Sequence, residues 1–342
     1  MDETVIELFQ ADTSRFSSPA FLLKLHEWGI DVIRFIQQVE TPALTAVVKF
    51  ITALGTEALY VPLLLLVFWA IDEKRGLRLG ILIIVSAWIN SVLKVLLRQP
   101  RPFDLDPALA LAVEHTYGAP SGHAQMALCF WVSIAAWLGG VWPKRRTLIW
   151  AAAFFIVLII SFTRLYLGVH FPTDLFAGWL LAALILAGFF AASPRLETFL
   201  AKGGTRLQNI AAAGIALIMN GLFPHDRTLS ALFLGFCLGY ILMKQRFPFS
   251  ARLEINGKKP DIRILIARCF TGFAGFIVLF FALRLIFPGA GSFFSGTPIW
   301  GADSPFYEMS RFIRYGLLGF WASAGAPRLF QRMSLAHGEP ER

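Results

Sequence analysis

Charged residues are scarce in this sequence. Asp, Glu, Lys and Arg make up 15% of the 342 residues, whereas hydrophobic residues make up 56%. A soluble globular domain carries about 25% charged residues, so much of this surface must face something other than water. Because long apolar runs recur along the chain with only short polar breaks, the composition excludes a string of soluble domains and indicates one polytopic membrane protein.

The sequence also lacks the patterns that bind metals. Cys129, Cys237 and Cys269 all lie in apolar stretches, which favours buried hydrophobic roles over redox or metal chemistry. No acidic cluster suits Mg²⁺ and no His/Cys set suits Zn²⁺, so we expect neither a metal nor another cofactor. The N-terminus is acidic and has no basic segment before a short apolar run, so we expect no cleaved signal peptide.

The basic residues are arranged as membrane-topology signals rather than as a nucleic-acid patch. The net charge is +9, but Lys and Arg gather in short clusters between apolar runs, as in cytoplasmic loops. We therefore expect no nucleic-acid partner, an exterior N-terminus, a cytoplasmic C-terminus, and loops 98–122 and 167–171 on the extracytoplasmic side of a plasma or bacterial inner membrane. The basic loop residues are Lys74, Arg75 and Arg78; Lys144, Arg145 and Arg146; Arg195, Lys202 and Arg206; and Lys244, Arg246, Arg252, Lys258, Lys259 and Arg263.

The apolar runs predict an all-α, polytopic membrane helix bundle. A helix needs roughly 20 apolar residues to cross the hydrocarbon core, and helices satisfy their backbone groups internally. Apolar residues at helical spacing over 19–38, interrupted by charges, predict an amphipathic helix at the membrane interface. About nine spans are expected, near residues 43–71 (broken at Gly55), 78–97, 123–142, 147–166, 172–192, 207–223, 228–244, 263–287 and 311–330.

Three short polar segments interrupt the apolar background. They are Lys94–Pro102, Pro120–His123 and Thr163–Asp174. The predicted topology places all three at the same membrane face, although the spans were assigned without reference to them. Ionisable residues at a membrane boundary are candidates for function, so we expect a site here.

The cations of these segments suit a phosphate group. Lys94, Arg101 and Arg164 have no adjacent carboxylate partner apart from Asp104 and Asp106 further along the loop, and Arg can hold a dianion bidentately. Ser121 is expected to cap a helix whose free N–H groups form an anion site, and Gly122 would let the backbone approach the ligand.

Two histidines complete the predicted chemistry. His170 and Asp174 are four residues apart, and Pro172 sets a first helical turn, so both can share one helix face. A carboxylate on one imidazole nitrogen leaves the other as a nucleophile. His123 could protonate the leaving oxygen as a general acid. These parts suffice for two-step phosphoryl transfer without a metal.

These residues resemble the type 2 phosphatidic acid phosphatase superfamily, whose signature is K-x6-RP, PSGH and SR-x5-H-x3-D. The three segments match it in order, and the one departure is Thr163 in place of Ser, which keeps the hydroxyl. The resemblance covers roughly residues 80–190. It implies a phosphohistidine on His170, proton donation by His123, orientation of His170 by Asp174, and phosphate binding by Lys94, Arg101, Ser121, Gly122 and Arg164.

The expected function is therefore the hydrolysis of a lipid phosphate monoester or pyrophosphate. The alternatives are a sugar-phosphate phosphatase of glucose-6-phosphatase type, a lipid phosphotransferase, and a non-enzymatic lipid transporter. We divide the chain into an N-terminal segment with the interfacial helix (1–40), a catalytic core (41–195) and additional C-terminal helices (196–342). The last part would widen lipid access or form a homodimer face, where the glycines of 268–275 permit close helix packing.

Overall fold

The computed structural model of the protein describes residues 20–224, 226–251, 261–287 and 306–336. All regular secondary-structure elements assigned in these described residues are helices, which confirms the all-α prediction. The first 19 residues of the predicted N-terminal segment, and Arg252, Lys258 and Lys259 of the basic loops, lie outside the described residues.

The described residues form two compact units. Unit 1 contains residues 20–61 and 86–191, and unit 2 contains residues 62–85 and 192–336. The division into three parts at 40 and 195 therefore stays a prediction. Unit 1 is built from α2 (Ala20–Gln37), α3 (Pro42–Ala53), the start of α4 (Glu57–Leu66), the second half of α5 (Glu73–Leu97), α6 (Pro102–Leu105), α7 (Gly122–Val141), α8 (Arg146–Tyr166) and most of α9 (Pro172–Lys202).

Six described helices are long and apolar enough to cross a membrane, or seven if the bent pair Pro42–Ala53 and Glu57–Ile71 is one span. The bend of 41° falls at residues 54–56, where the sequence places Gly55. The six are Glu73–Leu105, Gly122–Val141, Pro143–Tyr166, Pro172–Lys202, Thr228–Arg246 and Ile262–Ile286.

The predicted count of about nine spans is not confirmed. The span expected at 207–223 is a helix, α10 (Gly204–Leu222), but polar residues such as Arg206 and Gln208 in its first turns lower its mean hydropathy. The span expected at 311–330 is divided into α13 (Tyr307–Phe320), the π-helix η5 (Trp321–Gly325) and α14 (Ala326–Arg332). None of these three reaches the length of a membrane crossing by itself.

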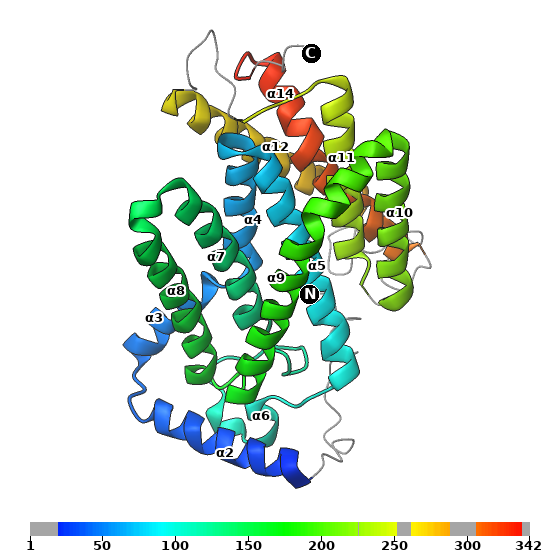
Figure 1. The fold of residues 1–342 in the computed structure, drawn as a ribbon. Coiled ribbons are helices and arrows are strands. Elements are labelled where there is room, and N and C mark those ends of the chain that lie inside the picture. Colours follow the sequence, from blue (N-terminus) through cyan, green and yellow to red (C-terminus); the bar gives the residue numbers. More distant parts are fainter. Residues whose placement is uncertain (1–19, 225, 252–260, 288–305, 337–342) are drawn as a thin grey trace. The chain divides into compact units, whose positions relative to one another are not determined.

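Helices α7 and α8 pack side by side in unit 1 (Figure 1). Ala127 of α7 is buried against Val157 and Ile160 of α8. The pairing brings the first turn of α7 and the last turn of α8 to one end of the unit. The polar segments Pro120–His123 and Thr163–Asp174 are attached at that end.

The helix predicted at 19–38 is α2, which contacts α6 and α8 (Figure 1). Ile33 on its inner face is fully buried with Leu109 and Phe171, whereas Phe35 on the other face is 71% exposed. Gln37 donates hydrogen bonds from Nε2 to the carbonyl oxygens of Leu109 (3.0 Å) and Tyr166 (2.9 Å). Thus α2 supports the turn that follows α8; its place at the membrane interface stays a prediction.

Unit 2 contains a second break in helical regularity, the π-helix η2 (Val67–Ile71). Trp69 of η2 is fully buried and donates from Nε1 to the Ala322 carbonyl oxygen of η5 at 2.8 Å. A Cβ atom on Gly272 or Gly275 of α12 (Ile262–Ile286) would lie within 2.6 Å of Trp69 or Trp321 respectively. These glycines therefore allow close packing, as expected, and the residues packed against them belong to the same chain.

Candidate active site

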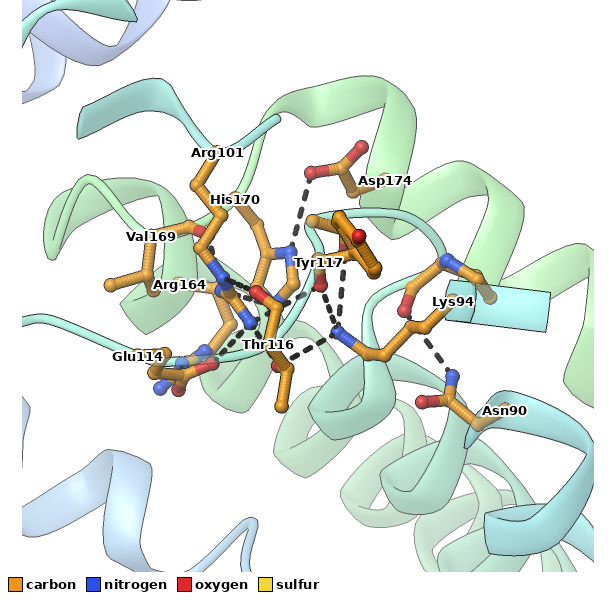
Figure 2. A network of polar contacts seen from close by, with 12 residues as sticks. Asn90, Lys94, Arg101, Glu114, Thr116, Tyr117, Arg164, Val169, His170 and Asp174 are labelled. Atoms are coloured by element: carbon orange, nitrogen blue, oxygen red, sulfur yellow. Dashed lines mark hydrogen bonds and ion pairs between the residues drawn. The ribbon is translucent and has the colours of Figure 1, made fainter. Parts of the chain in front are cut away.

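The end of unit 1 formed by α7 and α8 gathers the polar segments of the sequence (Figure 2). Lys94 lies in the last turn of α5, Arg101 directly precedes α6, and Arg164 lies in the last turn of α8. His170 lies in the turn between α8 and α9, and Asp174 lies in the first turn of α9. All five side chains are buried, with at most 7% exposure.

The segment Thr116–Tyr117 lies against two of the cations (Figure 2). Lys94 donates from Nζ to the Tyr117 carbonyl oxygen and to Thr116 Oγ1 at 3.4 Å. Arg101 donates from Nη2 to the same Thr116 Oγ1 at 2.7 Å, and from Nη1 to the Val169 carbonyl oxygen at 2.7 Å. Uncharged carbonyl and hydroxyl oxygens thus position both cations.

Glu114, which sequence reasoning missed, joins the two arginines. Its Oε2 lies 2.8 Å from Arg101 Nη2, and its Oε1 accepts a hydrogen bond from Arg164 Nη2. Arg164 also donates from Nη1 to Thr52 Oγ1 at 2.6 Å. The expectation that these cations lack a nearby carboxylate apart from Asp104 and Asp106 is therefore wrong. Glu114 stands in an irregular loop without periodicity, so no sequence signal points to its partners.

The charge of Glu114 responds to the whole group of cations. Burial by itself raises the pKa of the Glu114 carboxyl, but the positive charges of Arg101 and Arg164 outweigh it, with smaller contributions from His123 and Lys94. Together they lower the pKa to about 2. The carboxylate is therefore ionised over the physiological pH range.

The spacing of His170 and Asp174 produces the expected contact. Asp174 Oδ2 lies 3.2 Å from His170 Nδ1 and accepts the backbone N–H of Phe171 at 2.9 Å. With Nδ1–H directed at the carboxylate, Nε2 carries the lone pair. This Nε2 lies 3.4 Å from Arg101 Nη1. Burial lowers the pKa of His170 well below its ordinary value, and the charges of Arg101, Lys94 and Arg164 act in the same direction.

The segment Pro120–His123 differs in detail from the predicted helix cap. Ser121 has the extended backbone of an N-cap, but its side chain makes no capping bond, and Oγ is buried without a hydrogen-bond partner among the described residues. The Ser121 N–H instead donates to the Asp174 carbonyl oxygen at 3.0 Å. A Cβ atom on Gly122 would lie 3.2 Å from Asn90 Oδ1. Asn90 of α5 also donates from Nδ2 to the Pro120 carbonyl oxygen at 3.2 Å, so this bond and that of Ser121 hold the start of α7 against α5 and α9.

His123 is half-buried in the first turn of α7 and makes no hydrogen bond within the described part of the chain. A positive charge on its imidazole would lower the pKa of both Glu114 and His170, so His123 lies within electrostatic range of the same cluster. No group of three or more His, Cys, Asp or Glu side chains in the described residues could hold a metal ion. The expected independence from metals stays a prediction.

Comparison with known proteins identifies two matching regions. Residues 75–197, which contain all the residues predicted for the site, match the PAP2 superfamily. Residues 227–338 match the transmembrane extension of PAP2 superfamily phosphatases.

Curated relatives of this chain are lipid phosphatases by name. It is 29% identical over 162 residues to an undecaprenyl-diphosphatase of Sulfolobus acidocaldarius, covering 46% of this chain and 75% of that protein. It is 30% identical over 154 residues to phosphatidylglycerophosphatase B of Bacillus subtilis, covering 43% of this chain and 74% of that protein. Sphingosine-1-phosphate phosphatase 2 of Mus musculus is 32% identical over 143 residues, covering 41% of this chain and 40% of that protein.

Proposed function

Since this chain belongs to the PAP2 superfamily and is a membrane-embedded phosphatase, we propose that it hydrolyses a lipid phosphate monoester or pyrophosphate through a phosphohistidine on His170. The observation that carries this proposal is the geometry of the imidazole. Asp174 accepts the Nδ1–H, and the opposite nitrogen lies beside the guanidinium of Arg101. A phosphoryl group held by this guanidinium would lie within reach of the Nε2 lone pair, and the positive charge would stabilise the oxygens of the group under attack.

In the first step, Nε2 of His170 forms a bond to phosphorus while the bond between phosphorus and the leaving oxygen breaks. His123 gives a proton to that oxygen. In the second step, water attacks phosphorus, His123 takes the proton of the water, and the P–N bond breaks to release inorganic phosphate. Lys94, Arg101 and Arg164 stabilise the charge on the phosphoryl oxygens. The Ser121 hydroxyl, which has no partner among the described residues, and the Gly122 N–H add donors at the start of α7.

The substrate class follows from the relatives and the surroundings of the site. The names of the three relatives specify lipids that end in a phosphate or diphosphate. The site lies at the ends of apolar helices rather than in a soluble domain. A headgroup can reach this position while its acyl or prenyl chain stays in the bilayer, which favours a lipid over a free sugar phosphate.

The membrane side of the site is part of the proposal. Lys144, Arg145 and Arg146 are exposed at the connection between α7 and α8, at the opposite end of these helices from the site. Because cytoplasmic loops carry an excess of basic residues, this arrangement supports an extracytoplasmic side for the site. A cysteine replacing Lys144 should react with an impermeant thiol reagent only from the cytoplasmic side; labelling from outside would reverse the assignment.

The function is tested by phosphate release from the full-length protein in detergent with EDTA present. Lipid monophosphates and a lipid pyrophosphate should be hydrolysed, and glucose 6-phosphate should not. Release from the sugar phosphate alone would favour the sugar-phosphate phosphatase. Phosphate transfer to an added lipid alcohol would favour the phosphotransferase, and lipid movement without phosphate release would favour the transporter.

The nucleophile is tested by trapping the intermediate. Rapid quenching with ³²P-labelled lipid phosphate should leave acid-labile label on the wild-type protein and none on His170→Ala. The matched control is His115→Ala, because His115 is exposed in the loop before the site. Label or turnover that survives in folded His170→Ala would refute the assignment.

A further inference from the structure

The carboxylate of Glu114 holds the same guanidinium groups that the proposed function gives to phosphate. Its two oxygens contact the Nη2 atoms of Arg101 and Arg164. The other contacts of the Arg101 guanidinium are made with Thr116, Tyr117, Val169 and His170. Arg164 directs Nη1 to Thr52, and its Nε is buried without a hydrogen-bond partner among the described residues. A phosphoryl group can therefore bridge the two Nη2 donors of the arginines only if the Glu114 side chain moves away.

Glu114 resembles a phosphate in the features that the arginines recognise. It presents two oxygens and a negative charge to two planar guanidinium groups, as a phosphate would. Its side chain is 30% exposed, whereas those of Arg101 and Arg164 are 1% and 3% exposed. Arg101 is held by several further hydrogen bonds and Arg164 by one to Thr52, so the more exposed carboxylate is the partner that can leave.

We propose that Glu114 is a built-in competitor of the substrate, and that a terminal phosphate binds by displacing this carboxylate from Arg101 and Arg164. The inference rests on the proposed function, because it gives the same two arginines to the phosphate. The neighbouring residues Thr116 and Tyr117 accept hydrogen bonds from Lys94 and Arg101. A phosphate that takes these cations also competes with those bonds, so its binding loosens the segment 114–118.

Competition of this kind sets a threshold for binding. Moving Glu114 costs the same free energy for every anion, so it weakens all anions by one factor. A dianionic terminal phosphate, attracted strongly by three cations, still binds. The monoanionic phosphodiesters of surrounding lipids are attracted less strongly. Although these lipids are abundant in the bilayer, they therefore do not saturate the site. Glu114 thereby keeps the site available for monoesters and pyrophosphates.

The test is Glu114→Gln in the full-length protein in detergent, with orthovanadate as the phosphate-like probe. Glutamine keeps the shape but removes the charge, so vanadate should inhibit lipid phosphate hydrolysis at about tenfold lower concentration, as expected when a charge-assisted bond no longer competes. Phosphatidylglycerol added to the micelles should inhibit the variant more strongly than the wild type. The matched control is Asp106→Asn, because Asp106 of the same loop pairs with Arg34 at 2.8 Å and should leave both values unchanged.

A second measurement uses the wild-type protein and does not depend on the stability of the variant. Hydrogen exchange of residues 113–118 should become faster when vanadate is added. Unchanged or weaker vanadate inhibition in folded Glu114→Gln, or slower or unchanged exchange in the wild type, would overturn the inference and make Glu114 a fixed support of the arginines. If the wild type neither releases phosphate from lipids nor binds vanadate, the proposed function itself fails, and this inference fails with it.

Discussion

Gly168 lies so close to Leu109 that a Cβ atom added to it would be 2.0 Å from the Leu109 carbonyl oxygen. Its φ of +68° also belongs to the left-handed region, which costs other residues roughly 1–2 kcal/mol. Gly168→Ala should therefore displace the turn that carries His170. We expect a lower melting temperature and a lower kcat, measured by thermal unfolding and phosphate release in detergent.

The matched control for this substitution is Gly214→Ala in α10, where a Cβ atom would have no neighbour within 4 Å. Alanine is favoured over glycine inside a helix by about 1 kcal/mol, so this variant should melt at the same or a slightly higher temperature. Equal melting and equal kcat for the two variants would show that the turn tolerates a side chain at 168.

Asp174→Asn separates orientation of the nucleophile from phosphate binding. The carboxylate oxygen Oδ2 serves both His170 Nδ1 and the Phe171 N–H, and an amide cannot accept both bonds as strongly. The variant should lose roughly 100-fold or more in kcat, the range of a catalytic proton-handling group, while vanadate affinity changes only a few-fold. Equal losses in both would show that Asp174 maintains the site as a whole.

The pH dependence of the reaction follows from His170. Burial, and then the charges of Arg101, Lys94 and Arg164, lower its pKa well below the ordinary 6.5, so the nucleophile keeps its lone pair as the pH falls through 6.5. The acidic limb of kcat/KM should therefore lie below pH 6.5, as measured in mixed micelles. A limb at or above pH 6.5 would contradict the assignment.

The lowered pKa of His170 also makes the free energy of unfolding depend on pH. Below pH 6.5 the unfolded chain binds a proton at His170 before the folded protein does, so this contribution to stability is complete above pH 6.5 and is lost as the pH falls towards the folded pKa. Glu114 acts at lower pH, because its folded pKa of about 2 lies below its ordinary 4.5. Its contribution is present above pH 4.5 and is lost as the pH falls towards 2.

Arg268 allows a test of what stabilises unit 2, whereas the candidate active site belongs to unit 1. It is fully buried in α12, donates to the carbonyl oxygens of Leu335 (2.9 Å) and Ala251 (3.0 Å), and lies 5.5 Å from the centre of the Phe249 ring. Arg268→Ala leaves these oxygens without their donor, at about 1–3 kcal/mol each. The melting temperature should fall clearly, whereas Arg263→Ala, exposed on the same helix, should change it little. Similar melting of both variants would contradict a structural role for Arg268.

The predicted helix bounds agreed best with the structure where one continuous apolar stretch forms one helix. The spans expected at 123–142 and 147–166 are the helices Gly122–Val141 and Arg146–Tyr166. The span expected at 311–330 was less accurate, because η5 interrupts the helix where Trp321 and Ser323 pack against glycines of neighbouring helices. Such a break depends on the partner helices and leaves no mark in local hydropathy.

The sequence by itself determined which stretches are apolar enough to enter a bilayer and that His170 and Asp174 would meet. The first follows from composition, and the second from a spacing of four residues that runs from the turn before α9 into its first helical turn. Only the tertiary structure decided which anion faces the cations. Asp104 is closest to Arg101 along the chain, but it accepts the Arg101 backbone N–H at 2.7 Å, and the guanidinium pairs instead with Glu114. The path of the loop through space makes that choice, and no local periodicity encodes the path.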